Sequence, residues 1–325
     1  GVHIYSADYG LSERHGRGEL PPAEGPLALP RVAVAHFWEQ GLRQEGVALS
    51  LAAPVPPGTG LGSSSAMTVA LIRALAAYLG QTLNADEVAD LACRLEIERL
   101  GMPIGRQDQY IAAFGGVNAI SFDRSGVEVT PIAMSAATRQ RLERNLLLFF
   151  TGSSRHSSEI LRQQQRRTAH NVPDVIEALH VIKALAAETR RALERGDVDA
   201  IGELLDEGWQ RKKKLASSIS NAFIDECYAL ARSRGALGGK VTGAGGGGFL
   251  LFYCPRRSQP GVRSALTACG LTPVDFRFDY AGVQLLLNAL KLDVARLRAP
   301  GQVGARDRAS PPAPSAPVSD PRSMG

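Results

Sequence analysis

The segment Ala53–Leu75, APVPPGTGLGSSSAMTVALIRAL, constrains the chain more than any other part of its sequence. Prolines and glycines are followed by a run of serines that leads directly into an apolar segment. From Ser65 to Gly80 the apolar residues recur at helical spacing, which predicts a helix. The preceding residues, GVALSLAAPV, alternate as a strand does. The pattern therefore predicts a strand, a glycine-rich loop and a helix N-terminus in direct succession.

The composition of this loop suits the binding of a polyanion. The first turn of a helix leaves backbone N–H groups unpaired, and the helix dipole adds a partial positive charge there. Gly58, Gly60 and Gly62 let a phosphate approach the backbone closely, because no side chain intervenes. Serine hydroxyls add donors, and one of them can serve Mg²⁺, which prefers oxygen ligands. A flexible turn with a serine cap is the simpler alternative for such a segment.

Two familiar phosphate loops do not fit these residues. The P-loop requires a lysine directly before its Ser or Thr, and here leucine and glycine precede the serines. The dinucleotide fingerprint requires Gly-x-Gly-x-x-Gly followed by a second strand. The glycine spacing differs, and the next predicted element is a helix from Ala85 to Leu100 capped by Asn84. A dinucleotide-dependent oxidoreductase is therefore disfavoured.

The remaining pattern predicts a mixed α and β chain. A strand-like start, a helix from Arg31 to about Glu45, and a strand pair in GGVNAISF and VEVTPI fill the first part. NLLLFFTG at Asn145–Gly152 reads as a buried strand and is interpreted as the start of a second domain. Helices are then predicted in residues 172–197, 197–218 and 221–234. We expect domains at 1–144 and 145–298, and a disordered Pro/Ala/Ser-rich tail at 299–325.

Composition limits the class of function. The 325 residues are 44% hydrophobic and 21% charged, with a formal net charge of +5. No apolar run reaches the roughly 18 to 20 residues that span a bilayer, so no membrane segment is expected. The basic excess is small and scattered, and aromatic residues make up 6%, which disfavours a nucleic-acid binder. The four cysteines are scattered in apolar stretches, which predicts buried thiols in a reducing cytoplasm. The oligomeric state is left open.

Two motifs resemble those of the GHMP kinases, small-molecule kinases named for galactose, homoserine, mevalonate and phosphomevalonate. PPGTGLGSSSA at Pro56–Ala66 is similar to the second motif of that family, and KVTGAGGGGFLLFY at Lys240–Tyr253 is similar to the third. They occur in the family's order. The resemblance implies that ATP is the cofactor. The residues that it assigns to ATP binding are Pro56, Gly58, Gly60, Leu61, Gly62, Ser63, Ser64, Ser65, Gly243, Ala244, Gly245 and Gly246.

A third segment, LEIERLGMPIGRQDQYIAAFGG at Leu95–Gly116, resembles the family region that carries the metal and catalytic carboxylates. The resemblance implies that Glu96 binds Mg²⁺ together with Ser64, and that Asp108 is the catalytic carboxylate. Glu98 is the alternative metal ligand, and it points about 160° around the helix from Glu96. Both glutamates are ordinary surface charges if composition alone is considered.

Within the family, PIGRQDQYIAAFGG, LFFTGSSRHSSEIL and DEGWQRKKKLASSISN most resemble the D-glycero-D-manno-heptose 7-phosphate kinases. This implies a small-molecule sugar phosphate substrate, whose anomeric hydroxyl receives the ATP γ-phosphoryl group. Arg106, Arg155 and Lys213 are the candidates for binding the substrate phosphate. Lys213 belongs to the run of lysines at 212–214, for which a solvent-exposed helix face is the alternative interpretation. Trp209 is expected to pack between helices. A fucokinase-like sugar 1-kinase and a truncated non-catalytic nucleotide-binding protein remain alternative functions.

The fold that the resemblance implies is α+β and two-lobed. The N-terminal lobe would be ribosomal-S5-domain-2-like and the C-terminal lobe ferredoxin-like. The family's first motif, a Gly-Gly-Gly-Thr-Asp-like loop, has no counterpart in this sequence, which starts at Gly1. We therefore expect an N-terminus that is truncated relative to the family.

Overall fold

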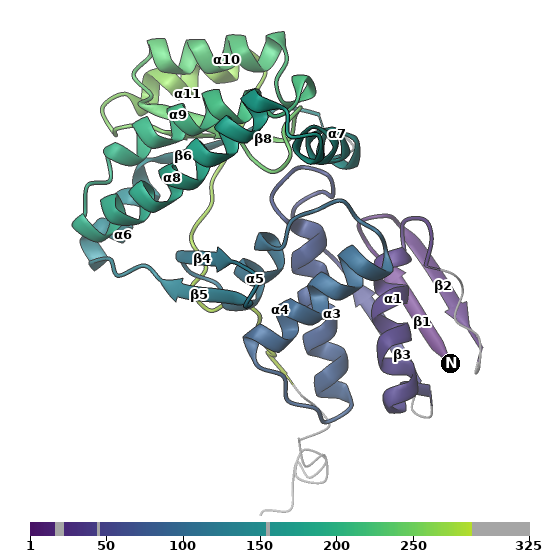
Figure 1. Cartoon of the computed structure of the whole chain (residues 1–325). Coiled ribbons are helices and arrows are strands. Elements are labelled where there is room, and N and C mark those ends of the chain that lie inside the picture. The colour runs from purple at the N-terminus through teal and green to yellow at the C-terminus, as the bar shows by residue number, and fades with distance from the viewer. Residues whose placement is uncertain (17–22, 44–45, 154–156, 288–325) are drawn as a thin grey trace, which may run out of the picture. The chain divides into compact units, whose positions relative to one another are not determined.

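The computed structural model describes residues 1–16, 23–43, 46–153 and 157–287 (Figure 1). Contacts between Cα atoms separate Gly1–Leu286 from Leu287–Gly325. The predicted tail at 299–325 and the end of the predicted second domain lie outside the described residues. Within the described residues, none of the helices combines the length and the apolar character needed to cross a membrane.

The first part of the chain forms two small sheets and a group of helices. Strand β1 pairs with β2 in antiparallel and with β3 in parallel orientation, and β4 and β5 form the predicted antiparallel pair. Helix α3 packs against α1, α4 and α5. The elements are β1 (Val2–Ser6), β2 (Leu11–His15), α1 (Ala28–Phe37), η1 (Trp38–Leu42), β3 (Val47–Leu51), α3 (Ser63–Tyr78), α4 (Ala85–Cys93), η2 (Arg94–Arg99), α5 (Gln107–Phe114), β4 (Asn118–Phe122), β5 (Val127–Pro131) and α6 (Ala136–Asn145).

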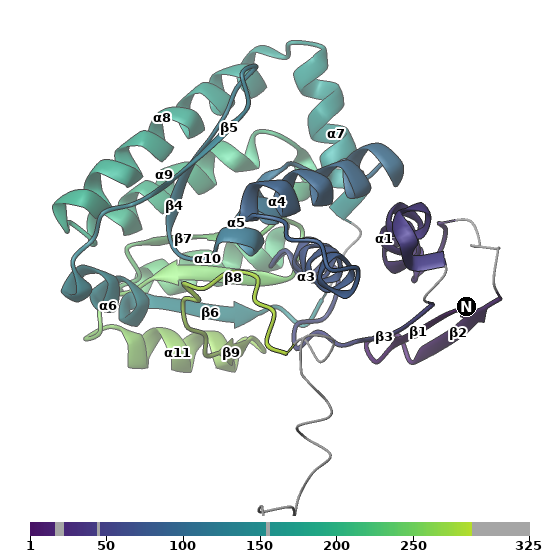
Figure 2. The ribbon, with the colours of Figure 1, turned by 90° about the horizontal axis from the view of Figure 1, so that it is seen from below.

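The second part is built on one antiparallel sheet with the strand order β7-β8-β6-β9. Helices join β6 to β7 and β8 to β9, which is the βαββαβ arrangement of a ferredoxin-like fold, as predicted. Helices α8 and α9 run side by side, and α9 packs on β7 (Figures 1 and 2). The elements are β6 (Leu146–Phe150), α7 (Ser157–Ala169), α8 (Pro173–Arg195), α9 (Ala200–Lys213), η3 (Ser217–Ile219), α10 (Ala222–Ser233), β7 (Gly238–Val241), β8 (Phe249–Tyr253), α11 (Gln259–Ala268) and β9 (Thr272–Val274).

Each part has its own buried core. Phe37, Ile72 and Tyr110 belong to the core of the first part, which extends from Val2 to Ala113. Trp209 belongs to the main core of the second part and is completely buried. The prediction that Trp209 packs between elements is therefore confirmed. The cysteines are free thiols, and Cys269 alone among them is half-buried, whereas the other three are buried.

Two predicted helices differ from the observed ones at functionally relevant points. Helix α3 begins at Ser63 and not at Ser65, because Gly62 adopts a left-handed conformation (φ 71°) and occupies the position before the helix. The helix predicted for Ala85–Leu100 starts at its Asn84 capping box as expected, but it widens into the π-helical turn η2. Such widened turns occur frequently at functional sites, and this one carries Glu96.

Other elements were placed less well by the sequence pattern. The helix predicted from Arg31 to about Glu45 is α1, which starts at Ala28, followed by the widened turn η1 that contains Gly41 at a φ of 125°. Helices α5, α6, α7 and α11 were not predicted. Helix α5 begins at Gln107 in the segment GRQDQ, so Asp108 lies in its first turn.

Candidate active site

The N-terminus of α3 carries unsatisfied backbone donors. No side chain caps this helix, and its first intrahelical bond is donated by Ala66 to the carbonyl of Gly62 at 2.9 Å. Among the described residues, the amides of Gly62, Ser63, Ser64 and Ser65 have no acceptor. Since such donors and the helix dipole favour an anion, this helix start can hold phosphate oxygens.

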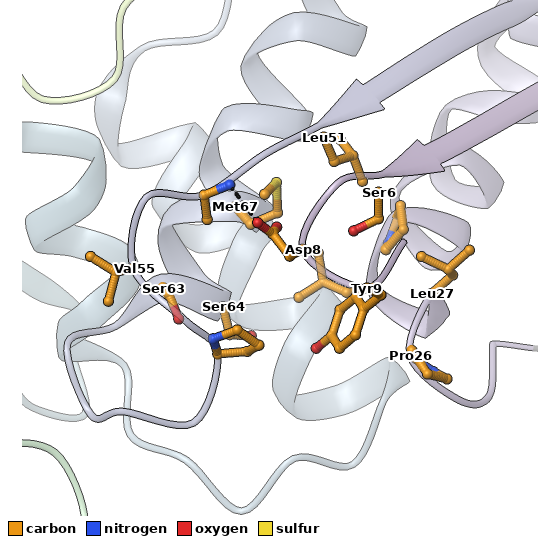
Figure 3. A pocket seen from close by; sticks show the side chains of 14 residues that line it. Ser6, Asp8, Tyr9, Pro26, Leu27, Leu51, Val55, Ser63, Ser64 and Met67 are labelled. Carbon is orange, nitrogen blue, oxygen red and sulfur yellow. Dashed lines mark hydrogen bonds between the residues drawn. The ribbon is translucent and has the colours of Figure 1, made fainter. Parts of the chain in front are cut away.

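A pocket adjoins these serines (Figure 3). Val55, Ser63 and Ser64 lie on one side of it, and Tyr9 and Leu27 lie on the other. The amide of Ala53 donates to Asp8 Oδ1 at 2.9 Å, which links the strand exit of β3 to the turn after β1. Apolar residues dominate the wall, so the pocket can accept a flat apolar group next to the phosphate donors. It is lined by Ser6, Asp8, Tyr9, Pro26, Leu27, Leu29, Pro30, Leu51, Ala53, Val55, Pro57, Ser63, Ser64 and Met67.

The two glycine-rich motifs contact each other through their backbones. A Cβ atom added to Gly60 would lie 2.9 Å from the carbonyl oxygen of Thr242 and 3.2 Å from the Cα of Gly243. A Cβ added to Gly248 would lie 2.2 Å from the carbonyl oxygen of Thr59. Side chains at these positions would therefore separate the motifs, and the glycines permit their contact.

Part of the second glycine motif, which lies within Lys240–Tyr253, is fixed by hydrogen bonds within the protein. The amide of Gly246 donates to the carbonyl of Ile219 and that of Gly248 to the carbonyl of Ser153, each at 2.8 Å. In the described part of the chain, the amides of Gly243, Ala244 and Gly245 have no acceptor. Gly246 thus has no free amide for a phosphate, whereas the three preceding residues retain theirs.

Ser64 and Glu96 form a direct hydrogen bond. Ser64 Oγ donates to Glu96 Oε1 at 2.7 Å, and the Gln109 amide donates to the other carboxylate oxygen, Oε2. Glu96 and Gln109 are both completely buried, and Gln109 Oε1 has no hydrogen-bond partner among the described residues. Glu98, the alternative metal ligand, is exposed.

These oxygen atoms fit a magnesium ion. Mg²⁺ is commonly held by one or two protein oxygens together with substrate phosphates and waters. Ser64 and Glu96 supply two hard oxygen donors beside the uncapped helix start. The unpartnered Gln109 oxygen is a further acceptor next to them, suited to a water molecule bound to the ion.

Asp108 lies directly against the first glycine loop. A Cβ added to Gly62 would be 3.2 Å from Asp108 Cγ, a tight contact that would require the carboxylate to shift, and the φ of 71° at this position also favours glycine. Burial raises the pKa of Asp108 above its ordinary value, and the nearby positive charge of Lys240 partly opposes this increase. Asp108 also lines a second pocket, which includes Arg277 and Asp279.

Two of the three predicted substrate-phosphate residues, Arg106 and Lys213, pair with carboxylates other than Asp108. Arg106 pairs with Asp90 at 2.8 Å and stacks over Tyr110, and Lys213 pairs with Asp225 at 3.3 Å. Arg155 lies outside the described residues. The structure thus brings together Ser64, Glu96, Asp108 and both glycine motifs, and the roles of these three cations stay predictions.

Two lysines lie near the glycine motifs, and sequence reasoning assigned no role to one of them, Lys240. Lys212 Nζ donates to the carbonyl oxygens of Gly243 and Val241, the latter at 3.4 Å. Lys240 interacts electrostatically with Asp108. Lys212 was weighed only as one member of a lysine run, and Lys240 only as the first residue of the motif. A lysine within the short, otherwise uncharged strand β7 (GGKV) was the available signal.

Comparison with known proteins identifies the class. The profile of the GHMP kinases N terminal domain matches residues 28–116, and that of the GHMP kinases C terminal region matches residues 189–270. The chain belongs to the GHMP kinase family and is a phosphotransferase.

Individual relatives narrow this class. The D-glycero-alpha-D-manno-heptose 7-phosphate kinase of Campylobacter jejuni is 35% identical over 71% of this chain and 68% of its own length. A mevalonate kinase of Thermococcus gammatolerans is 29% identical over 74% of this chain and 69% of the relative. The likeness to the heptose 7-phosphate kinase supports a sugar kinase of the family.

Solved structures agree with this assignment. A putative sugar kinase from Campylobacter jejuni superposes with a TM-score of 0.70 at 30% identity, covering 87% of this chain and 82% of that one. A D-glycero-D-manno-heptose 1-phosphate kinase from Bacteroides thetaiotaomicron superposes with a TM-score of 0.68 at 29% identity, covering 86% and 81% of the two chains.

Proposed function

We propose that this chain is an ATP- and Mg²⁺-dependent kinase that phosphorylates the anomeric hydroxyl of a heptose 7-phosphate. The observation that carries the proposal is the position of Ser64, Glu96 and Asp108 around the uncapped start of α3. The Campylobacter jejuni relative, named for heptose 7-phosphate, suggests the sugar. The Bacteroides thetaiotaomicron structure is named for the 1-phosphate, so the position of transfer is part of the test.

In this proposal ATP lies across the two glycine motifs. Its phosphates accept hydrogen bonds from the free amides of Gly62–Ser65 and Gly243–Gly245. The base occupies the pocket between Val55 and Leu27 (Figure 3). Pro56, Gly58, Gly60 and Leu61 shape the loop, since Gly58 and Gly60 both have a φ near 80°.

Ser64 and Glu96 are the residues that would hold Mg²⁺. The bound ion supplies neutralisation of phosphate charge, which is a main requirement of phosphoryl transfer. The protein's own contribution is to bury Glu96 and to direct its carboxylate through Gln109. Because Gln109 follows Asp108 in α5, the same helix orients the metal ligand and the catalytic carboxylate.

Asp108 acts as the general base. Its carboxylate accepts the proton of the sugar hydroxyl while the sugar oxygen forms a bond to the γ-phosphorus, and the bond from that phosphorus to ADP breaks. Burial raises the pKa of Asp108, which makes the carboxylate a stronger base than an exposed aspartate. Most of the rate enhancement comes from alignment of the two substrates.

The remaining sequence-based assignments belong to the same proposal. Arg106, Arg155 or Lys213 binds the substrate phosphate, and the enzyme works in the cytoplasm. The boundary between the two lobes lies between residues 144 and 145. The step from α6 into β6 at Leu146 supports that boundary, because β6 is the central strand from which the second sheet is built.

The test is a substrate panel with the wild-type chain and Asp108→Asn. ATP consumption is measured with heptose 7-phosphate, heptose 1-phosphate, free heptose, L-fucose and mevalonate, and the product position is determined by phosphorus NMR. We expect turnover with heptose 7-phosphate, and a loss of about 10²-fold or more in kcat for Asp108→Asn with unchanged ATP affinity.

A fucokinase-like activity is the second candidate, because a bifunctional fucokinase/GDP-fucose pyrophosphorylase of Arabidopsis thaliana is 30% identical over 64% of this chain and 20% of its own length. Turnover of free L-fucose without heptose 7-phosphate would overturn the heptose assignment in its favour. ATP binding without turnover of any panel member would support the non-catalytic alternative.

A further inference from the structure

Two lysines from different elements converge on the second glycine motif. Lys240 lies on β7 opposite Leu251 of β8, and Lys212 lies near the end of α9. The Lys212 ammonium donates to the carbonyl oxygens of Val241 and Gly243, so it is fixed to the turn that follows β7. Because Gly243 touches Gly60, both lysines lie close to the first glycine loop.

The two lysines differ in how their charges are satisfied. Lys212 has its two carbonyl acceptors, which explains its position structurally. Lys240 makes no hydrogen bond or ion pair with any described residue. Its electrostatic neighbours are Asp108 and Lys212. The Lys240 ammonium is therefore available to an anion next to Asp108, whereas that of Lys212 is already used by the turn.

The charges in this cluster do not balance. The Lys240 ammonium interacts with the Asp108 carboxylate and also with the positive charge of Lys212, which has carbonyl acceptors but no carboxylate partner among the described residues. Burial lowers the pKa of Lys212 to about 7, and the positive charge of Lys240 contributes to this decrease. Burial lowers the pKa of Lys240 as well, against the opposing effect of Asp108. Both lysine side chains are half-buried, and a local excess of positive charge beside the glycine motifs favours the binding of an anion.

We propose, on the basis of the function proposed above, that Lys240 is a catalytic residue that meets the transferred phosphoryl group beside Asp108. Its ammonium neutralises the negative charge of the phosphoryl oxygens and remains protonated throughout. The hydroxyl proton passes to Asp108, the sugar oxygen bonds to phosphorus, and ADP leaves with the electron pair of the broken bond. Lys212 is a positioning residue that holds the turn at Gly243.

The test compares Lys240→Met and Lys240→Arg with the wild type and with Lys183→Met. Lys183 is an exposed lysine of α8 without an ion pair in the described part of the chain, so it provides a matched control. For each protein we would measure kcat and KM, the affinities for ATP and ADP, and the thermal midpoint. The ATP and ADP affinities report on the terminal phosphate even without turnover.

We expect Lys240→Met to lower kcat about 100-fold and to lower the preference for ATP over ADP about tenfold. The KM for the sugar should stay similar to that of the wild type. Lys240→Arg should retain part of kcat and part of the preference for ATP, and Lys183→Met should resemble the wild type. The thermal midpoint of Lys240→Met stays equal or rises, because the repulsion between the charges of Lys240 and Lys212 has been removed. If Lys240 only supported the fold, Lys240→Met would instead lower the thermal midpoint.

The pH profile gives a readout that a structural role would not change. The charged residues near Asp108 are Lys240 from β7 and Arg277 and Asp279 from the shared pocket, and Lys212 adjoins Lys240. Since Lys240 lowers the pKa of Asp108, Lys240→Met moves the acidic limb of kcat to higher pH.

Two results separate this proposal from the function on which it rests. If no sugar is phosphorylated but Lys240→Met reduces the ATP preference, the substrate assignment fails and the role of Lys240 stands. If Lys240→Met keeps kcat, the ATP preference and the acidic limb of the wild type, the role of Lys240 is wrong although the kinase assignment stands.

Discussion

Gly60 and Gly243 lie so close together that a Cβ atom on Gly243 would be 2.5 Å from the Cα of Gly60. The two residues come from motifs far apart in the chain, and their contact combines two sets of unpaired amides at one place. Neither position tolerates a side chain without moving backbone.

Gly243→Ala should therefore separate the two motifs. The alanine methyl group meets backbone atoms and must adopt a φ near 59°, so we expect a loss of about 3 kcal/mol in the free energy of unfolding. The affinity for ATP falls at the same time. Urea denaturation and ATP titration measure both effects.

Gly261→Ala is the control for this substitution. Gly261 lies in α11 with open space around its Cα, so alanine should stabilise the helix by about 0.5 to 1 kcal/mol. Equal stability of Gly243→Ala and the wild type would show that the motif contact is not tight in solution.

Glu96→Gln should weaken the use of Mg²⁺. The substituted amide loses the negative charge and presents a donor to Ser64 or Gln109, which are already donors to Glu96. We expect kcat to fall about tenfold or more, and saturation to require more Mg²⁺. A Mg²⁺ titration of initial rates measures both.

Glu98→Gln should behave like the wild type, because Glu98 is exposed two residues further along η2. Its effect on unfolding should stay within about 0.5 kcal/mol. The assignment of the metal ligand reverses if Glu98→Gln shifts the Mg²⁺ requirement and Glu96→Gln does not.

Lys212 should make stability depend on pH. Its pKa is about 7 in the folded protein instead of 10.5, so between these values the unfolded chain binds a proton that the folded chain does not. The free energy of unfolding should then rise with pH, by up to about 1.4 kcal/mol per unit above pH 7. Urea denaturation between pH 7 and 9 measures the slope.

Lys212→Met should flatten this slope, whereas Lys214→Met, at an exposed neighbouring position, should retain it. The predicted linkage is wrong if wild type and Lys212→Met show the same pH dependence.

Val55→Trp should block the pocket of Figure 3. The larger side chain occupies space assigned to the base of ATP, so we expect KM for ATP to rise about tenfold while kcat changes little. Phe223→Trp, at an exposed position of α10, is the control. A change in the sugar KM with normal ATP kinetics would mean that the pocket receives the acceptor.

The local features of this protein could be predicted from its sequence. The sequence predicted the strand, glycine loop and helix around Ser63–Ser65, the helix cap at Asn84 and the buried strand at Leu146–Phe150. These features depend on residues close together in the chain, because glycine conformation, caps and side-chain alternation are local properties. The family motifs similarly gave Ser64, Glu96 and Asp108 as candidates.

Only the tertiary structure decided between neighbouring candidates. The widened turn η2 buries Glu96 and exposes Glu98, and packing of α9 on β7 brings Lys212 to Gly243 while Lys213 pairs with Asp225. The proximity of Lys240 to Asp108 likewise depends on the contact between the two glycine motifs. Burial and electrostatic environment come from residues distant in sequence, so no local pattern contains them.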